Sequence, residues 1–365
     1  MKNFPNQRRV MYAVLLVCIA GLTLVAANAS GSFIGPFNTL SVVASTVPGN
    51  GDLNPYGLVV VQQSVGALIQ GDTLVSNFNN AANLQGTGTT IVEVAPDGAT
   101  TLFAQIQAKN LPGPCPGGIG LTTALVVLSK GWVIVGSLPT TDGTAATAQA
   151  GCLLVLNSHG QVVETISGSP INGPWDMTAF DHGTVVELFV TNVLNGIVAA
   201  KGNVVNSATV VRIDMIIPDD KAPRELSRTV IGSNLPARTD PSALVIGPTG
   251  VGLGNDGTLY IADTLQNRIA AISDAMHRQN SAGIGITVSR NGALNGPLGL
   301  VIAPNGDILV TNGGDGNIVE STPAGSQVAV KTIEPSGAGT LFGVAIAPIG
   351  IYFVDDGTNA LGLLH

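Results

Sequence analysis

The chain has 365 residues, of which 10% are charged and 45% are hydrophobic, and it contains 47 glycines and 21 prolines. An ordinary soluble domain carries about 25% charged residues, yet this chain is too hydrophobic and too weakly charged to be intrinsically disordered. Its 15 Lys and Arg residues against 23 Asp and Glu residues give a formal net charge of −8, which argues against a nucleic-acid partner or an anionic membrane surface.

The N-terminal residues have the features of an export signal. Three basic residues precede an apolar run over residues 10–27, and Ala27-Asn28-Ala29 is a small-x-small cleavage site. We therefore expect residues 1–29 to be a signal peptide and residues 30–365 to form one domain that is secreted or periplasmic. Retention of the apolar run as an anchor is the alternative, because about 20 apolar residues can span a bilayer.

From residue 40 onward the chain is a series of short apolar strands separated by Gly and Pro. An isolated strand over residues 40–46 comes first, and pairs of strands follow, each pair ending on a polar residue. Successive pair ends lie 44 to 71 residues apart, which is room for about four short strands, the content of one β-propeller blade. The six ends are Asn77, Ser137, Asn192, Asp263, Asn312 and Asp356.

The fourth of these pairs is expected to begin at Leu244, after an insertion over residues 215–238. This insertion is the most charged stretch of the mature chain. The sequence predicts that it is a solvated loop, with a partner contact as the alternative.

The last two pairs match each other without a gap. Residues 298–312 align with residues 342–356, and this alignment equates Asn312 with Asp356 and Thr311 with Asp355. A final strand at residues 360–364 leaves the sixth blade one strand short, whereas the strand at residues 40–46 has no partner of its own. We therefore expect an all-β, six-bladed β-propeller whose ring is closed by an N-terminal strand joining three C-terminal strands, which removes the open sheet edges.

One segment carries a family resemblance. Residues 256–269, Asp-Gly-Thr-Leu-Tyr-Ile-Ala-Asp-Thr-Leu-Gln-Asn-Arg-Ile, resemble the NHL repeat, whose pattern is a Gly turn, an apolar strand, Ala-Asp, a short turn and Asn-Arg-Ile. The other five copies match at the apolar strands and at the terminal polar residue. The resemblance implies a six-bladed propeller, a shape shared by non-catalytic scaffolds, SMP-30/gluconolactonase-type hydrolases and streptogramin lyases. A fold does not choose among such functions.

In a propeller, the ends of the second strands surround one mouth of the central channel. Aromatic residues lie near strand starts on the same face, and ligand pockets favour aromatic walls with a few polar groups. Turn formation by the polar residues and core packing by the aromatics are the alternatives. The predicted ligand-binding residues are Tyr56, Asn77, Ser137, Trp175, Asn192 and Phe342.

Oxygen-bearing side chains at these strand ends are also candidate metal ligands. Ca²⁺ takes six to eight oxygen ligands, and two adjacent carboxylates repel each other unless a cation or a donor is close. The predicted metal ligands are Asp263, Asn312, Asp355 and Asp356, with a solvated turn as the alternative. The resemblance to SMP-30-like enzymes implies one divalent metal at the channel mouth, although their Glu-Gly-Pro motif is replaced here by Asn54-Pro-Tyr-Gly57.

Removal of the signal peptide would leave two cysteines. Cys115 lies in a Pro-rich loop that leads into the second blade, and Cys152 begins the third strand of that blade, so both belong to the channel-mouth face. An oxidising compartment permits disulfides. We expect a Cys115–Cys152 disulfide, with two free thiols as the alternative.

Histidine is scarce, and none of the four falls at the end of an inner strand. Nucleophile–base pairs and His-based lyase mechanisms need a positioned imidazole. We therefore expect a monomeric exported propeller that binds a small-molecule or protein ligand at its channel mouth without catalysis and has no nucleic-acid or membrane partner. The alternative is a hydrolase of a lactone or similar ester that uses Ca²⁺ or another divalent cation, with Asn192, Asp263, Asn312 and Asp356 as its ligands.

Overall fold

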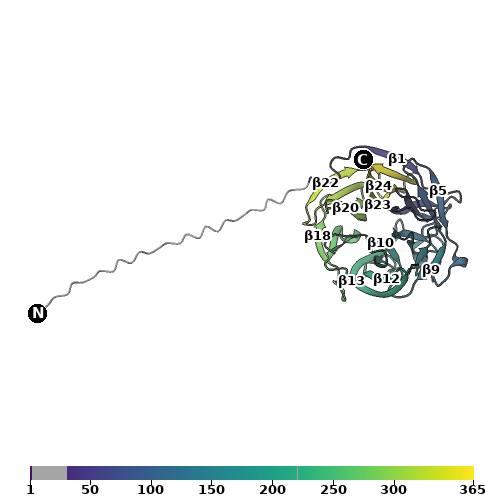
Figure 1. Cartoon of the computed structure of the whole chain (residues 1–365), viewed down its shortest axis with the longest axis horizontal. Helices are drawn as coiled ribbons and strands as arrows, with labels where there is room; N and C mark the ends of the chain where they lie inside the picture. The colour runs from purple at the N-terminus through teal and green to yellow at the C-terminus, as the bar shows by residue number, and fades with distance from the viewer. Residues whose placement is uncertain (2–30, 220) are drawn as a thin grey trace. The chain divides into compact units, whose positions relative to one another are not determined.

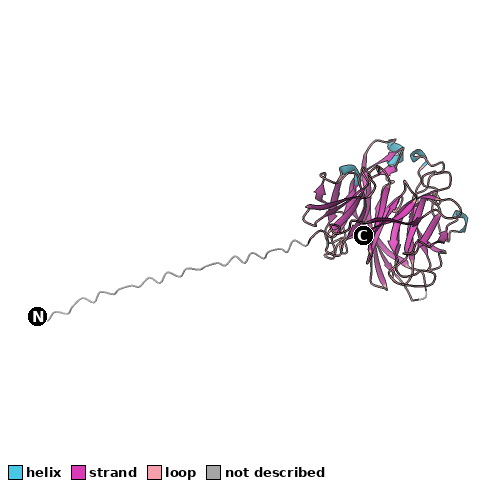
Figure 2. Cartoon of the chain, turned by 90° about the horizontal axis from the view of Figure 1, so that it is seen from above, coloured by secondary structure: helices cyan, strands magenta, loops and turns pink. Residues whose placement is uncertain are grey.

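The computed structural model describes residues 1, 31–219 and 221–365. The predicted signal peptide after Met1 and its cleavage site lie outside the described residues. Residues 32–365 form one compact unit, and this unit is a six-bladed β-propeller, as the strand pattern and the NHL resemblance predict (Figure 1). Strands dominate it, and helices occur only as short pieces (Figure 2). None of the described helices has the length and hydrophobicity needed to cross a membrane.

The blades follow one another in chain order. Blade 1 contains β2 (Leu53–Val60), β3 (Thr73–Asn79), β4 (Thr90–Val94) and β5 (Thr100–Gln105), and blade 2 contains β6 (Leu121–Val127), β7 (Val133–Ser137), β8 (Cys152–Leu156) and β9 (Val162–Ile166). Blade 3 has five strands: β10 (Pro174–Asp181), β11 (Val185–Asn192), β12 (Val205–Ile216), β13 (Arg224–Asp240) and β14 (Leu244–Ile246).

The remaining three blades have four strands each. Blade 4 contains β15 (Pro248–Leu253), β16 (Leu259–Asp263), β17 (Arg268–Ile272) and β18 (Ile286–Arg290), and blade 5 contains β19 (Pro297–Ile302), β20 (Ile308–Asn312), β21 (Asn317–Ser321) and β22 (Gln327–Thr332). Blade 6 combines β23 (Leu341–Ala347), β24 (Gly350–Asp355) and β25 (Ala360–Leu364) with β1 (Leu40–Ser45).

The ring closes through the two ends of the propeller unit. Strand β1 pairs antiparallel with β25, with Leu40 opposite Leu364, and Figure 1 shows the C-terminus beside β1. Beyond the paired strands, the backbone N–H of Thr39 donates to the carbonyl of His365 at 2.8 Å and the N–H of His365 donates back at 2.9 Å. The structure confirms the predicted closure by one N-terminal and three C-terminal strands.

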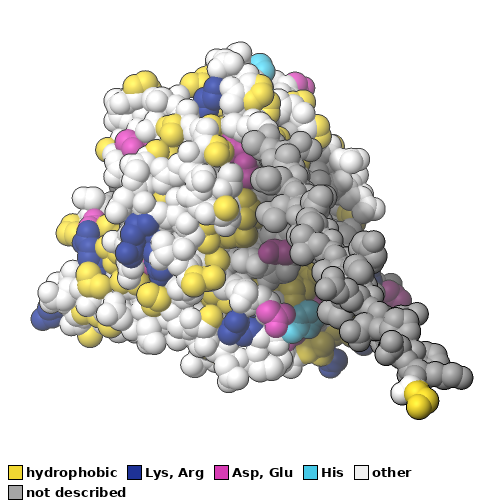
Figure 3. All heavy atoms as spheres, turned by 90° about the vertical axis from the view of Figure 1, so that its left-hand side faces the viewer, with side chains coloured by type: hydrophobic (Ala, Val, Ile, Leu, Met, Phe, Trp, Pro, Cys, Tyr) yellow, Lys and Arg dark blue, Asp and Glu magenta, His cyan; other side chains and the backbone are white. Residues whose placement is uncertain are grey.

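The stacking of six sheets explains the low charge of the chain. Every residue of the middle strands β3, β8, β16 and β20 is buried, because a neighbouring blade covers each face of these strands. Outer strands such as β22 alternate instead between half-buried and exposed positions. Figure 3 shows one side of the ring, on which charged side chains are few and scattered among uncharged surface.

Blade 3 corrects two of the sequence predictions. The charged insertion is not a solvated loop: most of it belongs to the long hairpin of β12 and β13, in which Asp214 pairs with Ser227. Leu244 does not open the fourth blade either. Strand β14 pairs with β13, Arg238 opposite Ile246, and blade 4 begins at Pro248. The run Leu244-Val245 is apolar and buried like an inner strand, but it packs in an additional edge strand of blade 3.

Candidate functional site

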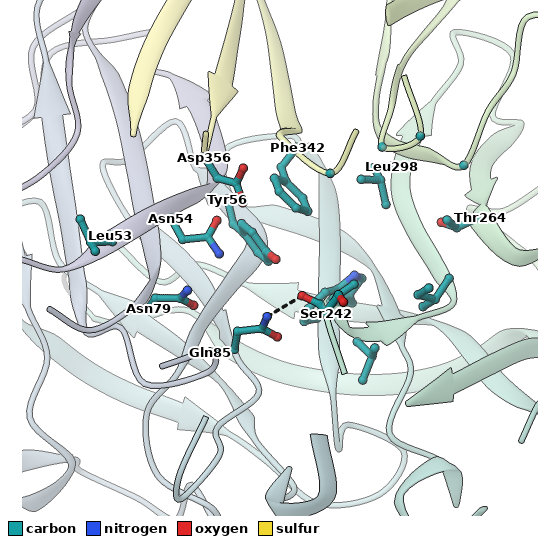
Figure 4. A pocket seen from close by; sticks show the side chains of 18 of the residues that line it. Leu53, Asn54, Tyr56, Asn79, Gln85, Ser242, Thr264, Leu298, Phe342 and Asp356 are labelled. Atoms are coloured by element: carbon teal, nitrogen blue, oxygen red, sulfur yellow. Dashed lines mark hydrogen bonds between the residues drawn. The ribbon is translucent and has the colours of Figure 1, made fainter. Parts of the chain in front are cut away.

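A cavity of about 540 Å³ lies at one mouth of the central channel. Its walls are formed by the start of β2, β10, β19 and β23 and by the residues that follow β3, β16, β20 and β24. The β13–β14 turn of blade 3 reaches over one side. Figure 4 shows side chains from several blades pointing toward this space.

Aromatic rings form the floor of the cavity. Tyr56 is stacked between Phe78, at a centroid distance of 4.4 Å, and Phe342, at 4.0 Å. The ring of Trp175 stands nearly perpendicular to Tyr56, with an interplanar angle of 86°. The predicted aromatics Tyr56, Trp175 and Phe342 all line the cavity, and all three also belong to the buried core. These three rings therefore form an apolar cavity floor that is held rigid by packing in the core of the propeller.

Amide side chains from blade 1 form part of the rim. Gln85 donates from Nε2 to the carbonyl of Ser242 at 2.6 Å, which links the loop after β3 to the β13–β14 turn across the cavity (Figure 4). A carbonyl can only accept, so this bond fixes the orientation of the amide. The oxygens Asn54 Oδ1, Asn79 Oδ1 and Gln85 Oε1 have no donor among the described residues. These three oxygens are themselves buried, so they do not open onto the cavity.

Asp356 supplies the carboxyl group that lines the cavity. A one-residue difference in strand register between blades 5 and 6 places it there. In blade 5, β19 and β20 pair Ile302 with Ile308, whereas β23 and β24 pair Ile346 with Ile351, so the turn in blade 6 is one residue shorter. Asn312 pairs with the strand start Pro297, and it is Asp355 that pairs with the equivalent Leu341. The ungapped sequence alignment was therefore wrong by one residue, and Asp356 lies one position beyond the strand end.

Backbone hydrogen bonds identify the residues equivalent to Asp356 in other blades. The N–H of Asp356 donates to the carbonyl of Thr340 at 2.9 Å, and the same bond is made by Gly313 to Gly296 and by Leu138 to Gly120. The residues at this position around the ring are Phe78, Leu138, Val193, Thr264, Gly313 and Asp356. Asp356 is thus the single ionisable side chain in that ring of six.

The two adjacent acids have different surroundings. Asp355 accepts from the N–H of Gly357 at 3.0 Å and from the hydroxyl of Thr358 at 2.8 Å, so its carboxylate is satisfied within its own turn. Burial, and secondarily the charge of Asp355, raises the pKa of Asp356 to about 7. Burial and the charge of Asp356 also raise the pKa of Tyr56, which keeps its hydroxyl protonated as a hydrogen-bond donor.

The other predicted ligand-binding residues are buried outside the cavity lining. Asn77 donates to the carbonyl of Thr46 at 3.0 Å, and Ser137 bonds to the backbone of Gly118 and Gly120. The side-chain oxygen of Asn192 accepts from the N–H of Asn172 at 3.3 Å. These three side chains hold the loops of their own or adjacent blades in place.

The predicted metal ligands do not come together into a divalent-cation site. Asp263 is paired with Arg268 and Asn312 donates to the carbonyl of Ala293, so of the four only Asp356 lines the cavity. Within the described part of the chain, no group of three or more His, Cys, Asp or Glu side chains could hold a metal ion. A Ca²⁺ ion takes six to eight oxygen ligands and binds best to several carboxylates. One half-buried carboxyl among amides does not fit that requirement.

The predicted disulfide is confirmed. Cys115 and Cys152 are joined by a disulfide bond with their Cα atoms 5.2 Å apart. The bond fastens the Pro-rich loop that precedes β6 to the start of β8.

Sequence reasoning missed the amides of the rim. Asn79 and Gln85 carry no sequence signal that distinguishes them from ordinary turn residues, and Asn54 is marked only as the start of the segment that replaces the Glu-Gly-Pro motif. Asn79 lies two positions beyond the strand end that the repeat had marked. Ser242 lies between the predicted insertion and the predicted start of the fourth blade, and the sequence gives no sign that β13 and β14 form a hairpin there.

No family model matches the chain, and no curated protein matches it in sequence. Among solved structures, a virginiamycin B lyase from Staphylococcus aureus is 17% identical and superposes with a TM-score of 0.54, covering 89% of this chain and 98% of that one. The calcium-binding protein regucalcin from Agrobacterium tumefaciens is 15% identical, with a TM-score of 0.53 and coverage of 88% of this chain and 93% of its own.

A luciferin-regenerating enzyme is 12% identical, with a TM-score of 0.52, and the match covers 89% of this chain and 94% of that one. At these identities the likeness concerns the fold and not the site. The chain therefore shares the six-bladed propeller fold of the streptogramin-lyase-like and SMP-30-like proteins, as the NHL resemblance implies.

Proposed function

We propose that this protein is an exported propeller that binds a small organic ligand in the channel-mouth cavity without transforming it. The observation that carries the proposal is the lining of the cavity, which combines the stacked aromatic floor of Tyr56 and Phe342 with polar side chains at the rim. Small-molecule sites are commonly 300–1,000 Å³ in volume, mostly apolar and equipped with a few placed polar groups. The cavity of about 540 Å³ falls within that range.

One observation favours the hydrolase alternative. A carboxyl with a pKa of about 7, as for Asp356, is suited to general acid–base catalysis near neutral pH. Ester or lactone hydrolysis also needs donors aimed at the developing oxyanion, and no Lys, Arg or His side chain lines the cavity in the described structure. The lack of a cationic donor thus favours binding over hydrolysis.

Three measurements separate these functions. The purified protein is equilibrated with Ca²⁺, Mg²⁺, Mn²⁺ or Zn²⁺, and bound metal, Tm and hydrolysis of glucono-δ-lactone are measured. We expect no stoichiometric metal uptake, no rise in Tm and no hydrolysis above the metal-only background. A metal-dependent rise in Tm together with lactone hydrolysis would instead establish the hydrolase.

Ligand binding is tested with a library of small aromatic and heteroaromatic compounds. A compound that binds only the folded state raises Tm in a concentration-dependent way. We expect such compounds to lose their effect in Trp175→Leu, which removes part of the cavity wall, and to keep it in Trp132→Phe. Trp132 is a matched control because it packs in a different hydrophobic cluster and does not line the cavity.

Export is tested by N-terminal sequencing of the protein recovered from outside the cytoplasm of an expressing host. We expect a mature chain that begins at Ser30. A chain that keeps its first residues and sediments with membranes would contradict cleavage and favour the anchored alternative.

A further inference from the structure

We propose that the ligand of the cavity is an organic cation, with an ammonium or similar N–H-bearing group on an apolar body, and that Asp356 is its counter-ion. This inference rests on the proposed binding function and adds the chemical class of the ligand. It stands on the placement of one unpaired carboxyl in an otherwise uncharged, aromatic cavity.

The side chain of Asp356 has no hydrogen-bond or ion-pair partner among the described residues, although it is half-buried and lines the cavity. Two buried acids elsewhere in the ring do have partners. Asp263 is paired with Arg268 at 2.8 Å, and Glu320 accepts from the Ser32 hydroxyl and from the N–H groups of Phe33 and Ile34. A carboxylate out of bulk water is costly unless it is paired. Because Asp356 lines the cavity, we infer that a bound ligand supplies its partner.

The rest of the lining matches a positively charged donor. No Lys, Arg or His side chain lines the cavity in the described structure, so an anionic ligand would meet Asp356 without compensation. An ammonium ligand supplies N–H donors and a positive charge to Asp356, whereas a carboxylate or phosphate supplies only further acceptors.

The apolar part of the cavity fixes how such a ligand lies. Asp356 is the one charged member of the ring of six equivalent positions, so the cationic end is held on the blade 6 side. Phe342 and Leu298 continue the lining from there, and Val245 and Ile246 face it from blade 3. The hydrocarbon body extends over these side chains, and the nearby aromatic rings add cation–π attraction at the charged end.

Binding of a cation is coupled to the ionisation of Asp356. Two titratable groups face this carboxyl: Asp355, which is adjacent in the chain, and the hydroxyl of Tyr56. The pKa of Asp356 is raised to about 7 without ligand, and a bound cation favours the charged form and lowers it. Affinity for the cation therefore rises as the pH increases toward 7 and levels off above 7.

The test uses three probes of similar shape: 2-phenylethylammonium, neutral 2-phenylethanol and anionic phenylacetate. Binding to the full mature protein is followed by Trp fluorescence in the Trp132→Phe background, which leaves Trp175 as the reporter. We expect the ammonium to bind roughly tenfold or more tightly than the alcohol at pH 8, because a hydrogen bond to a charged group contributes about 1.5–3 kcal/mol. Phenylacetate should bind most weakly.

Asp356→Asn should reduce the ammonium affinity to that of the alcohol and remove its pH dependence between pH 5.5 and 8.5. The matched control Asp219→Asn removes the same charge at a position whose side chain is 96% exposed, and it should change neither. Equal binding of ammonium and alcohol to the unsubstituted site would overturn the cation inference and leave the binding function intact. Absence of binding by all three probes at millimolar concentration would overturn both.

Discussion

Arg268 and Asp263 form an ion pair that is sealed inside blade 4, with Nε 2.8 Å from Oδ2 and exposed fractions of 1% and 0%. The guanidinium also donates to the hydroxyl of Thr287 and to the carbonyl of Ile284. Arg268 is the arginine of the segment that resembles the NHL repeat. The most specific motif of the sequence thus serves the fold, by tying β16 to β17 and to the region of β18.

This pair predicts a large stability effect. Arg268→Met leaves the Asp263 carboxyl buried without its partner, and breaking a buried pair costs about 3–5 kcal/mol. The free energy of unfolding should fall by that amount in urea denaturation at pH 7. The double variant Arg268→Met/Asp263→Leu should recover part of the loss, because it removes the uncompensated charge. A single variant within 1 kcal/mol of the parent would refute this account.

Ring closure predicts that the first strand stabilises the whole propeller. Deleting residues 38–45 removes β1 and leaves the edge of β25 open, so the apolar residues Leu361 and Leu363 lose cover. We expect a single cooperative transition at a much lower temperature, or aggregation through the open edge. Deleting residues 2–29 is the matched control and should leave the Tm unchanged. An unaltered Tm without β1 would contradict closure by this strand.

The raised pKa of Asp356 predicts that this carboxyl, which we propose binds the ligand, lowers the stability of the folded protein at neutral and alkaline pH. Its pKa is about 7 in the folded protein against 3.8 for the free group. As the pH rises from 4 to 7 the unfolded chain releases this proton first, so the folded state loses stability over that interval and the loss is complete above 7.

Asp356→Asn should therefore be more stable than the parent by about 1–2 kcal/mol at pH 8, since one pKa unit is about 1.4 kcal/mol and solvent in the cavity screens part of the cost. At pH 4 the two proteins should be equally stable. Other acids with raised pKa values are present in both proteins and cancel in the difference. A variant that is less stable at pH 8 would show that the carboxylate has a stabilising partner.

The disulfide predicts a reductant-sensitive stability. Cys115 and Cys152 are 37 positions apart, and closing a loop of that length lowers the entropy of the unfolded chain by an amount worth about 3–4 kcal/mol. We expect dithiothreitol, or the double variant Cys115→Ser/Cys152→Ser, to lower the midpoint of urea unfolding and to raise its slope, because the unfolded chain becomes less compact. Reductant should have no further effect on the double variant, which serves as its own control.

The fold was accessible from the sequence because each blade repeats a local pattern. Apolar strands with Pro/Gly turns appear six times, and the unpaired strand at residues 40–46 matched the strand missing from the last blade. The cavity aromatics Tyr56, Trp175 and Phe342 were accessible for the same reason, since they occupy strand starts.

The polar part of the site was less accessible. Asn77, Asn192 and Asn312 were marked by their position in the repeat, but their side chains are buried outside the cavity lining. Gln85 and Ser242 come from loops of blades 1 and 3 that are far apart in the chain, and a single bond brings them together over the channel. A local sequence pattern cannot predict such a contact between distant loops.

The sequence by itself determined the number of blades, the closing strand, the disulfide and the aromatic floor, because each depends on periodicity or on which face of a strand a residue occupies. Only the tertiary structure decided which of two adjacent acids faces the ligand space. A turn shorter by one residue moves Asp355 into the strand end and Asp356 beyond it, and since one position in a strand reverses the direction of a side chain, that difference sets the charge of the cavity.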